Sequence, residues 1–243
     1  MTRSARFWFS LIILSCSSAM PAFARDEGFR STFFTIDKNR WYISNGWSNG
    51  EHQSCEWRAD AFSIEDNKLV MTVSDQGGKV RPIGCPEMHT KTPTLYGRYE
   101  ARMRTAAGSG LNTAFFTYTG KSYGAPAHDE IDFEFLGKAP TKVEVNYFAN
   151  DQVVRGKIVD LGFDATKDFH DYGFDWSATG ITWYVDGAVV YKTPKGAPVP
   201  RIPSYLFLSL WSGAAMEDSW MGPFTYTNPV TAEVAWTRFT PHD

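Results

Sequence analysis

The chain of 243 residues carries 24 basic and 27 acidic side chains, a formal net charge of −3. A mildly acidic chain offers no basic surface for nucleic acid or for an anionic membrane, so neither is expected as a partner. Hydrophobic residues make up 43% of the sequence, enough for a well-filled core.

The N-terminal residues have the pattern of an export signal. Arg3 and Arg6 precede an apolar run at 7–14, and Ala-Phe-Ala at 22–24 supplies small residues for cleavage. This pattern predicts a secretory signal peptide over residues 1–24, and the apolar run is too short to span a bilayer. A lipoprotein signal is the alternative, because Ile-Leu-Ser-Cys precedes residue 17.

Removal of the signal leaves residues 25–243, which we expect to form one secreted, monomeric domain. Because the signal contains two arginines and no acid, its loss changes the formal charge from −3 to −5. The mature protein is therefore expected outside the cytoplasm, in the periplasm or the medium.

Two cysteines follow the signal, Cys55 and Cys85. An even pair in an exported chain predicts one disulfide, which the chain-entropy model values at about 3–4 kcal/mol for this loop length. Two buried free thiols are the alternative. No cysteine and histidine cluster has the spacing of a zinc site, so no metal is predicted.

Alternation of apolar and polar residues with a period of two predicts strands through the rest of the chain. The predicted strands are 68–73, 98–104, 111–119, 129–136, 142–147, 153–160, 170–176, 181–185, 188–191, 204–212 and 231–239. Turn residues separate them, at 77–78, 108–110, 124–126 and 194–200, and Asp186-Gly187 predicts a tight hairpin. Many short strands without long helices predict an antiparallel all-β sandwich.

The predicted strand at 129–136 contains a row of acids. Glu130, Asp132 and Glu134 alternate with apolar residues, so all three carboxyl groups lie on one face of the strand. Hydrolysis of a glycosidic bond needs two carboxyl groups in different protonation states. On a curved sheet, Glu130 and Glu134 could approach the separation of about 5–5.5 Å that retaining glycosidases use. The spacing leaves two alternatives open, a solvated face of an edge strand and a calcium site.

The segment 129–138, Asp-Glu-Ile-Asp-Phe-Glu-Phe-Leu-Gly-Lys, resembles the active-site strand of glycoside hydrolase family 16, the lichenase-like β-glucanases. The resemblance extends over nearly the whole mature chain, through the segments 48–50, 55–57, 115–120, 161–165, 183–187 and 209–211. The unbulged Glu-x-Asp-x-Glu spacing is that of the lichenase branch. Residues 86–87, 108–112, His128 and 218–222 are most similar to bacterial succinoglycan-depolymerising endo-1,3-1,4-β-glycanases.

The resemblance implies a curved antiparallel β-jelly-roll sandwich with an open concave cleft. It assigns Glu130 as the nucleophile that forms a glycosyl-enzyme intermediate, Glu134 as the general acid/base and Asp132 as an assisting carboxylate. It also implies substrate contacts by Asn49, Glu87, Phe116, Tyr118, Asn146, Phe148 and Trp211. For each of these the alternative is structural, since aromatic rings also pack cores and buried polar groups also satisfy hydrogen bonds.

Three positions depart from the lichenases. His128 and His89 replace a tryptophan and an arginine that contact sugar, so a smaller, titratable contact is expected at each. These changes favour a decorated or acidic exopolysaccharide over plain mixed-linkage glucan. Ala235 stands where lichenases have a calcium-ligating aspartate, so no calcium and no other cofactor are expected.

The sequence thus predicts a secreted retaining endo-β-glycanase that acts on a β-1,3-1,4-linked glucan or a succinoglycan-type polymer. A non-hydrolytic carbohydrate-binding sandwich is the alternative from another class, although binding alone does not require both glutamates. A transglycosylase is a third interpretation, because it would use the same covalent intermediate.

Overall fold

The computed structural model describes residues 27–120 and 127–242, and almost all of them belong to strands or short connections. The predicted signal peptide at 1–24 and the predicted turn at 124–126 lie outside these residues. Within the described ranges, no helix has the length and hydrophobicity that a membrane span needs.

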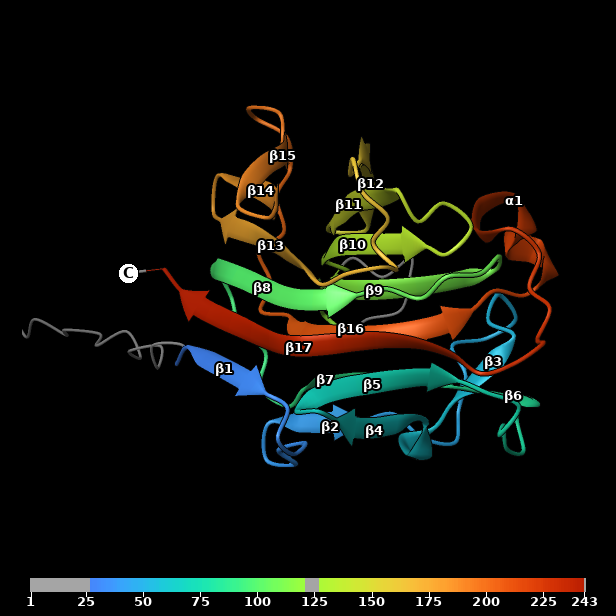
Figure 1. The fold of residues 1–243 in the computed structure, drawn as a ribbon. Coiled ribbons are helices and arrows are strands. Elements are labelled where there is room, and N and C mark those ends of the chain that lie inside the picture. Colours follow the sequence, from blue (N-terminus) through green and yellow to red (C-terminus); the bar gives the residue numbers. More distant parts are fainter. Residues whose placement is uncertain (1–26, 121–126, 243) are drawn as a thin grey trace, which may run out of the picture.

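Two antiparallel sheets account for most of the described residues (Figure 1). The first has eight strands in these ranges, seven in the order β15-β14-β13-β8-β17-β5-β4, with β1 also paired to β17. Their bounds are β15 Ala188–Lys192, β14 Gly180–Val185, β13 His170–Ser177, β8 Gly97–Arg104, β17 Val230–Pro241, β5 Lys68–Val73, β4 Phe62–Glu65 and β1 Phe29–Thr32.

The second sheet has seven described strands, in the order β12-β11-β10-β9-β16-β7-β2. Their bounds are β12 Gln152–Asp160, β11 Lys142–Ala149, β10 Glu130–Leu136, β9 Leu111–Tyr118, β16 Tyr205–Ser212, β7 Glu87–Thr90 and β2 Trp41–Ile43. Strand β10, which contains the acid row, pairs with β9 on one side and with β11 on the other. It is therefore a central strand, which contradicts the alternative of an edge strand.

Strands β3 Cys55–Trp57 and β6 Ile83–Cys85 form a small separate pair. They run parallel, unlike the antiparallel strands that the sequence predicted. Helical residues in the described ranges occur only in two 3₁₀ turns, Ala59–Ala61 and Ala215–Glu217, and in the four-residue helix α1 Asp218–Met221.

The core lies between the two large sheets. Phe115 on β9 packs against Phe174 on β13 with ring centroids 5.7 Å apart, and Phe133 on β10 lies 5.9 Å from Tyr172 on β13. The indole Nε1 of Trp183 crosses the core and donates a hydrogen bond to the backbone oxygen of Asp132 (3.1 Å). Because β10 turns its apolar residues into this core, its acids must lie on the opposite face of the sheet.

All eleven predicted strands are present, with ends that differ by at most two residues. The Asp186-Gly187 hairpin joins β14 to β15, and both residues have the positive φ (48° and 78°) of the expected tight turn. The sequence missed the strands of three or four residues, β1, β2, β3, β4, β6 and β7. Such short strands complete at most two periods, so alternation cannot reveal them.

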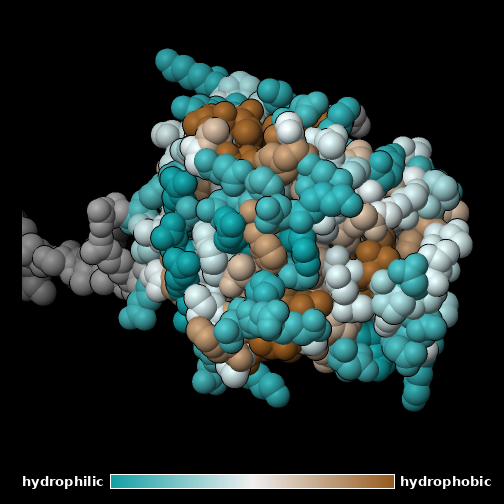
Figure 2. All heavy atoms as spheres, in the orientation of Figure 1, coloured by the Kyte–Doolittle hydropathy of each residue, from teal (hydrophilic) through white to brown (hydrophobic). Residues whose placement is uncertain are grey.

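The outer surface of the molecule is mostly hydrophilic on the side shown in Figure 2, with apolar residues in scattered groups. A few large apolar side chains in the described ranges are exposed, among them Tyr42 (44%), Trp47 (40%) and Met216 (65%). Tyr42 and Trp47 lie beside the cleft of the candidate site, so their exposed apolar surface borders that cleft.

Candidate active site

A cleft of about 900 Å³ lies on the face of the seven-stranded sheet that points away from the core. Glu130, Asp132 and Glu134 line it together, as their alternation predicts. Cross-strand neighbours continue the same face, because Asp132 is opposite Phe116 on β9 and Asn146 on β11. The acid row therefore lies in a lined cleft and is not a solvated outer surface.

Two amides hold the carboxyl group of Glu134. Asn112 Nδ2 donates to Oε1 (3.1 Å) and Asn146 Nδ2 donates to Oε2 (3.2 Å). Burial, followed by the charges of Glu130 and Glu144, raises the pKa of Glu134 to about 8, although the two amide donors oppose this. At neutral pH Glu134 is thus mainly protonated, the form that a general acid needs.

Asp132 lies between the two glutamates and is 3% exposed. Burial, together with the charges of Glu130 and Glu134, holds the pKa of Asp132 well above its usual range. It also shares a hydrogen bond with Glu130. A protonated Asp132 can donate a hydrogen bond to the Glu130 carboxylate. Asp132 then holds a second proton in the row, beside that of Glu134, and adds no negative charge.

The side chain of Glu130 is 22% exposed. Its Oε2 lies 2.7 Å from Nε2 of His128, whose Nδ1 lies 3.2 Å from Oδ1 of Asp151. The ring of His128 stacks on Phe148 with centroids 4.6 Å apart. Among the described residues, Glu130 therefore has an imidazole partner, whereas the hydrogen-bond partners of Glu134 are neutral amides.

Aromatic rings form the floor of the cleft between the acid row and the sheet edge. Phe116 stacks on Phe207 (4.8 Å), Phe207 lies 4.6 Å from His89, and His89 lies 4.9 Å from Tyr42. These residues come from β9, β16, β7 and β2 in turn. Flat rings in this arrangement can cover the C–H faces of successive pyranose units.

His89 is a neutral member of this floor. Burial lowers its pKa, although the hydrogen bond between its Nδ1 and the backbone oxygen of Thr90 (2.8 Å) opposes the shift. Glu87 lies beside it on β7, is 5% exposed and accepts a hydrogen bond from Ser44 Oγ (2.6 Å). Burial raises the pKa of Glu87 to about 7.

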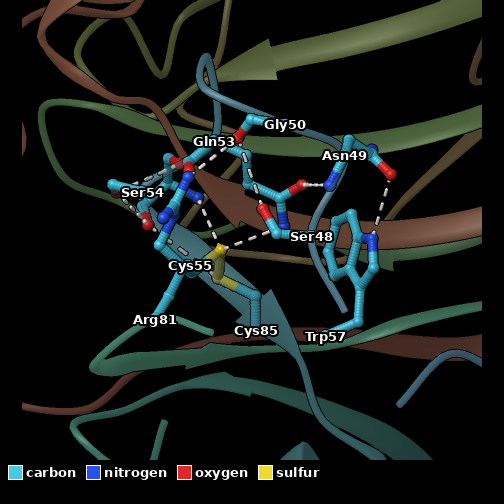
Figure 3. The surroundings of a disulfide bond; sticks show 10 residues. Ser48, Asn49, Gly50, Gln53, Ser54, Cys55, Trp57, Arg81 and Cys85 are labelled. Carbon is cyan, nitrogen blue, oxygen red and sulfur yellow. Dashed lines mark hydrogen bonds between the residues drawn. A yellow bond between two sulfur atoms is a disulfide. The ribbon is translucent and has the colours of Figure 1, made fainter. Parts of the chain in front are cut away.

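The predicted disulfide between Cys55 and Cys85 is present, and it adjoins another part of the cleft wall (Figure 3). Gln53 Nε2 donates to Cys55 Sγ (3.4 Å), and Gln53 Oε1 accepts from the backbone N–H of Asn49 (3.0 Å). The indole of Trp57 donates to Asn49 Oδ1 (3.2 Å). The disulfide region thus positions Asn49, one of the predicted substrate contacts.

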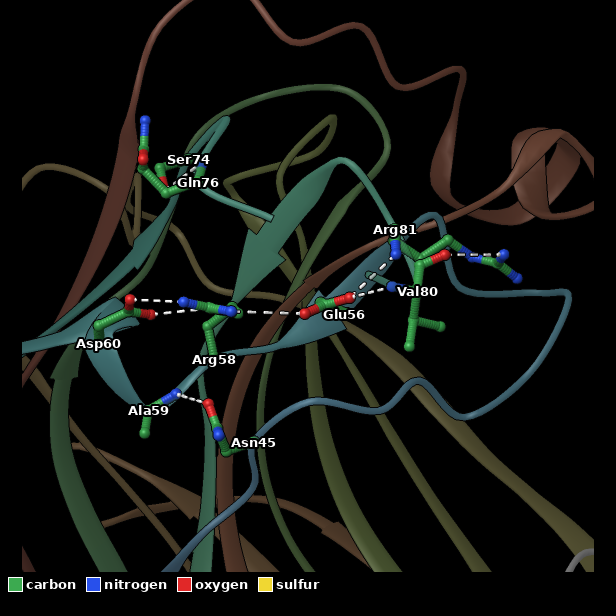
Figure 4. A network of polar contacts seen from close by, with 9 residues as sticks. All are labelled: Asn45, Glu56, Arg58, Ala59, Asp60, Ser74, Gln76, Val80 and Arg81. Carbon is green, nitrogen blue, oxygen red and sulfur yellow. Dashed lines mark hydrogen bonds and ion pairs between the residues drawn. The ribbon is translucent and has the colours of Figure 1, made fainter. Parts of the chain in front are cut away.

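A buried carboxylate anchors the loop that follows β5 beside this region (Figure 4). Glu56 accepts hydrogen bonds from the backbone N–H groups of Val80 (2.6 Å) and Arg81 (3.0 Å), and Arg58 lies 3.6 Å away. Burial acts to raise the pKa of Glu56, but these donors and the charge of Arg58 outweigh it and lower the pKa. Glu56 therefore remains ionised and ties two segments together.

The structure brings nearly all of the predicted site residues to one cleft. Its lining includes Asn49, Glu87, Phe116, Tyr118, His128, Phe148 and Trp211, together with the three acids. Asn146 is the exception, since it does not line the cleft but binds Glu134.

Several residues at the site were not predicted. Asn112 binds Glu134, Phe207 joins the aromatic floor, and three further residues line the cleft, namely Trp47 and, beside Trp211, His52 and Trp220. Alternation could have identified Phe207, which lies two positions before Ser209 and four before Trp211 on β16. Trp47, His52 and Trp220 lie outside the long strands, so no periodicity marks them.

Near Trp211, the indole of Trp220 lies 6.1 Å away by ring centroids and donates to Glu144 Oε2 (3.1 Å). Glu144 is opposite Glu134 on the neighbouring strand β11. Trp220 therefore connects the cleft wall to an acid that raises the pKa of Glu134. Within residues 27–120 and 127–242, no group of three His, Cys, Asp or Glu side chains is placed to hold a metal ion.

Comparison with known proteins identifies the family. Residues 49–238 match the model of Glycosyl hydrolases family 16. The chain is 38% identical to endo-1,3-1,4-beta-glycanase ExoK of Rhizobium meliloti (strain 1021), over 88% of this chain and 79% of that protein. It is also 38% identical to a beta-glucanase of Paenibacillus polymyxa, over 96% of this chain and 97% of that protein.

Solved structures agree with this assignment. A prokaryotic beta-1,3-1,4-glucanase (lichenase) derived from a mouse hindgut metagenome superposes with a TM-score of 0.82 at 36% identity, over 88% of this chain and 99% of that one. This match confirms the all-β jelly-roll fold and the resemblance to the lichenase branch. The chain therefore belongs to glycosyl hydrolase family 16 and is a glycoside hydrolase.

Proposed function

We propose that this glycoside hydrolase is an exported, retaining endo-β-glycanase that cuts internal bonds of a β-1,3-1,4-linked glucan or a succinoglycan-type exopolysaccharide. One observation carries the proposal. Glu130 and Glu134 lie on the same face of β10 in different surroundings, since burial raises the pKa of Glu134 to about 8 whereas Glu130 faces the imidazole of His128. The names of the two relatives, an endo-1,3-1,4-beta-glycanase and a beta-glucanase, support the substrate class.

In the first step, the protonated carboxyl group of Glu134 gives its proton to the glycosidic oxygen as the bond to the anomeric carbon breaks. The Glu130 carboxylate attacks the same carbon and forms a glycosyl ester. In the second step, the Glu134 carboxylate removes a proton from a water molecule, which attacks the anomeric carbon and releases Glu130. Two inversions at one carbon retain its configuration.

Asp132 and the two asparagines help to control where the protons of this cycle lie. A protonated Asp132 donates to Glu130 and so limits the repulsion within the row. Asn112 and Asn146 hold both oxygens of Glu134, which fixes the direction in which its proton can be delivered. The aromatic floor reaches from the row to exposed Tyr42, a length that suits a polymer chain.

The central test measures the release of reducing ends from polymer by the wild type and by Glu130→Gln. We expect cleavage by the wild type and none by the variant, with polymer binding retained because glutamine keeps the size of the side chain. A Glu130→Gln enzyme that still cleaves would refute the assignment of the nucleophile. Binding without cleavage by the wild type would favour the carbohydrate-binding alternative.

The stereochemistry has its own measurement. Proton NMR during the first minutes of hydrolysis should show the β-anomer of the new reducing end before mutarotation. Adding an acceptor oligosaccharide separates hydrolysis from transglycosylation, since a transglycosylase would give longer products in place of free reducing ends. Initial formation of the α-anomer would contradict a retaining mechanism.

The polymer is best identified with a panel of succinoglycan, lichenan and laminarin. We expect cleavage of succinoglycan and of lichenan, and resistance of the pure 1,3-glucan laminarin. The preference for a decorated polymer rests on His89, which lies on the cleft floor where lichenases have an arginine. Fast cleavage of laminarin alone would contradict the assignment to 1,3-1,4-linked substrates.

A further inference from the structure

We propose that Asp151 and His128 form a positioning relay that orients the Glu130 carboxylate and stabilises its negative charge for attack. The inference rests on the proposed function, in which Glu130 is the nucleophile. It gives His128 a role other than the sugar contact that the sequence predicted. Three observations support the proposal, and all of them concern described residues.

The first contact set concerns the two ring nitrogens of His128. Nε2 lies 2.7 Å from Glu130 Oε2, and Nδ1 lies 3.2 Å from Asp151 Oδ1. An ionised carboxylate can only accept hydrogen bonds, so the ring satisfies both partners only if both nitrogens carry protons. The geometry itself therefore requires an imidazolium between two carboxylates, with charge-assisted bonds on each side.

The second observation concerns the surroundings of the ring. His128 is 3% exposed, Phe148 covers one face at 4.6 Å with the rings 17° from parallel, and Tyr118 meets it edge-on at 5.4 Å. A ring packed in this way presents almost no surface to a sugar. Its contact with the reaction therefore passes through Glu130.

The third observation concerns the placement of Asp151. It lies in the two-residue turn between β11 and β12, where Asn150 and Asp151 both have positive φ (51° and 64°). The backbone N–H of Asp151 donates to the backbone oxygen of His128 (2.8 Å). Asp129, the residue between His128 and Glu130, accepts from the N–H of Asn150 (2.6 Å). The turn is thus tied to the 128–130 segment by backbone and side-chain bonds.

The charged and titratable groups around the pair agree with this role. Glu130 faces His128, Asp132, Glu134 and, from β9, Tyr118, and Phe148 is its uncharged neighbour on β11. Burial lowers the pKa of His128, but the hydrogen bonds and charges of Glu130 and Asp151 outweigh burial and raise it. Among the described residues that face Glu130, His128 is the cationic group, so it offsets the repulsion that the other acids exert on Glu130.

The kinetic test compares His128→Gln and Asp151→Asn with the wild type. Glutamine keeps one neutral donor near Glu130 and removes the charge. We expect kcat to fall about 10- to 100-fold with KM within about threefold, because the interaction serves the reacting carboxylate and does not touch sugar. The acid limb of the pH profile of kcat/KM should move up by about one unit, and Asp151→Asn should shift it less, in the same direction.

A matched control is available on the other sheet. His170 Nδ1 lies 2.7 Å from Asp186 Oδ2, and its ring stacks on Phe163 (3.5 Å), so it is a histidine–carboxylate pair of the same kind outside the cleft. His170→Gln should leave both kcat and the acid limb unchanged. A His128→Gln enzyme with an unchanged acid limb, or with raised KM and unchanged kcat, would overturn the relay.

A second measurement does not depend on activity. Side-chain NMR of His128 should give a pKa above the usual histidine range in the wild type and a lower one in Glu130→Gln and in Asp151→Asn. An ordinary His128 titration that neither variant changes would refute the relay, even if Glu130→Gln is inactive. Conversely, an active Glu130→Gln enzyme would refute the proposed nucleophile while the NMR result still decides whether the pairing exists.

Discussion

Single side chains on β10 differ mainly in what surrounds each carboxyl group. Glu134 is buried beside the acids Glu130 and Glu144, which disfavour a negative charge there, and its two amide donors offset this only in part. Glu130 instead faces a histidine. Identical side chains four residues apart thus acquire different chemistry from their neighbours, as is typical of paired catalytic carboxyl groups.

The state of Glu134 predicts how activity depends on pH. Because its pKa is about 8 and the acid role requires the proton, kcat/KM should fall as the pH rises past about 8. Glu134→Gln should reduce cleavage of polymer by about 10²- to 10⁴-fold. With an aryl glycoside that has a good leaving group, the variant should lose much less of the rate of the first step, because such a group leaves without a proton. Rate assays on both substrates would measure this difference. Equal losses on both would contradict the acid role.

The same group affects stability. In the folded state Glu134 keeps its proton up to its pKa of about 8, whereas the unfolded chain releases it near the ordinary glutamate pKa of 4.5. The folded state therefore binds more protons between these values, so stability should fall as the pH rises through this window. Glutamine does not ionise, so Glu134→Gln should remove the free-energy cost of burying an ionisable group here. The free energy of unfolding at pH 7.5, measured by denaturant titration, should rise by about 1–2 kcal/mol. No gain over wild type at pH 7.5, where wild-type Glu134 bears most of the cost, would contradict this.

Among the structural elements, the parallel pair β3–β6 depends on a covalent link. The disulfide joins residues 30 apart in the sequence, and each strand has only three residues. Cys55→Ser/Cys85→Ser should lower the free energy of unfolding by about 3–4 kcal/mol. KM should also rise, because Gln53 and Trp57 then hold Asn49 less firmly. A reducing agent should lower the stability of the wild type to that of the variant and leave the variant unchanged.

For the whole molecule, the sandwich has a large apolar core between its two sheets, and the described residues include no group of three metal-ligating side chains. Ala235, which stands where lichenases have a calcium ligand, has no oxygen side chain to offer. We expect EDTA and added Ca²⁺ to leave the melting temperature unchanged within about 1 °C, as differential scanning calorimetry can measure. A lower melting temperature in EDTA would reveal a metal that the sequence did not predict.

The acid row shows how much of the site the sequence could predict. The alternation of Glu130, Ile131, Asp132, Phe133 and Glu134 fixes their faces because side-chain direction in a strand depends only on local backbone geometry. The described strands of five or more residues were predicted for the same reason. The resemblance to the family supplied the roles, which composition and spacing left open.

Other features depended on contacts between distant segments. Asp151 meets His128 only because a turn 23 residues later folds back onto β10, and Asn112 reaches Glu134 across 22 residues. The parallel direction of β3 and β6 and the aromatic floor from four strands likewise follow from sheet order, which no local pattern encodes. By itself, the sequence determined which residues share a face. Only the tertiary structure decided their partners, and therefore which glutamate keeps its proton, because burial and charge at a site are sums over neighbours from the whole chain.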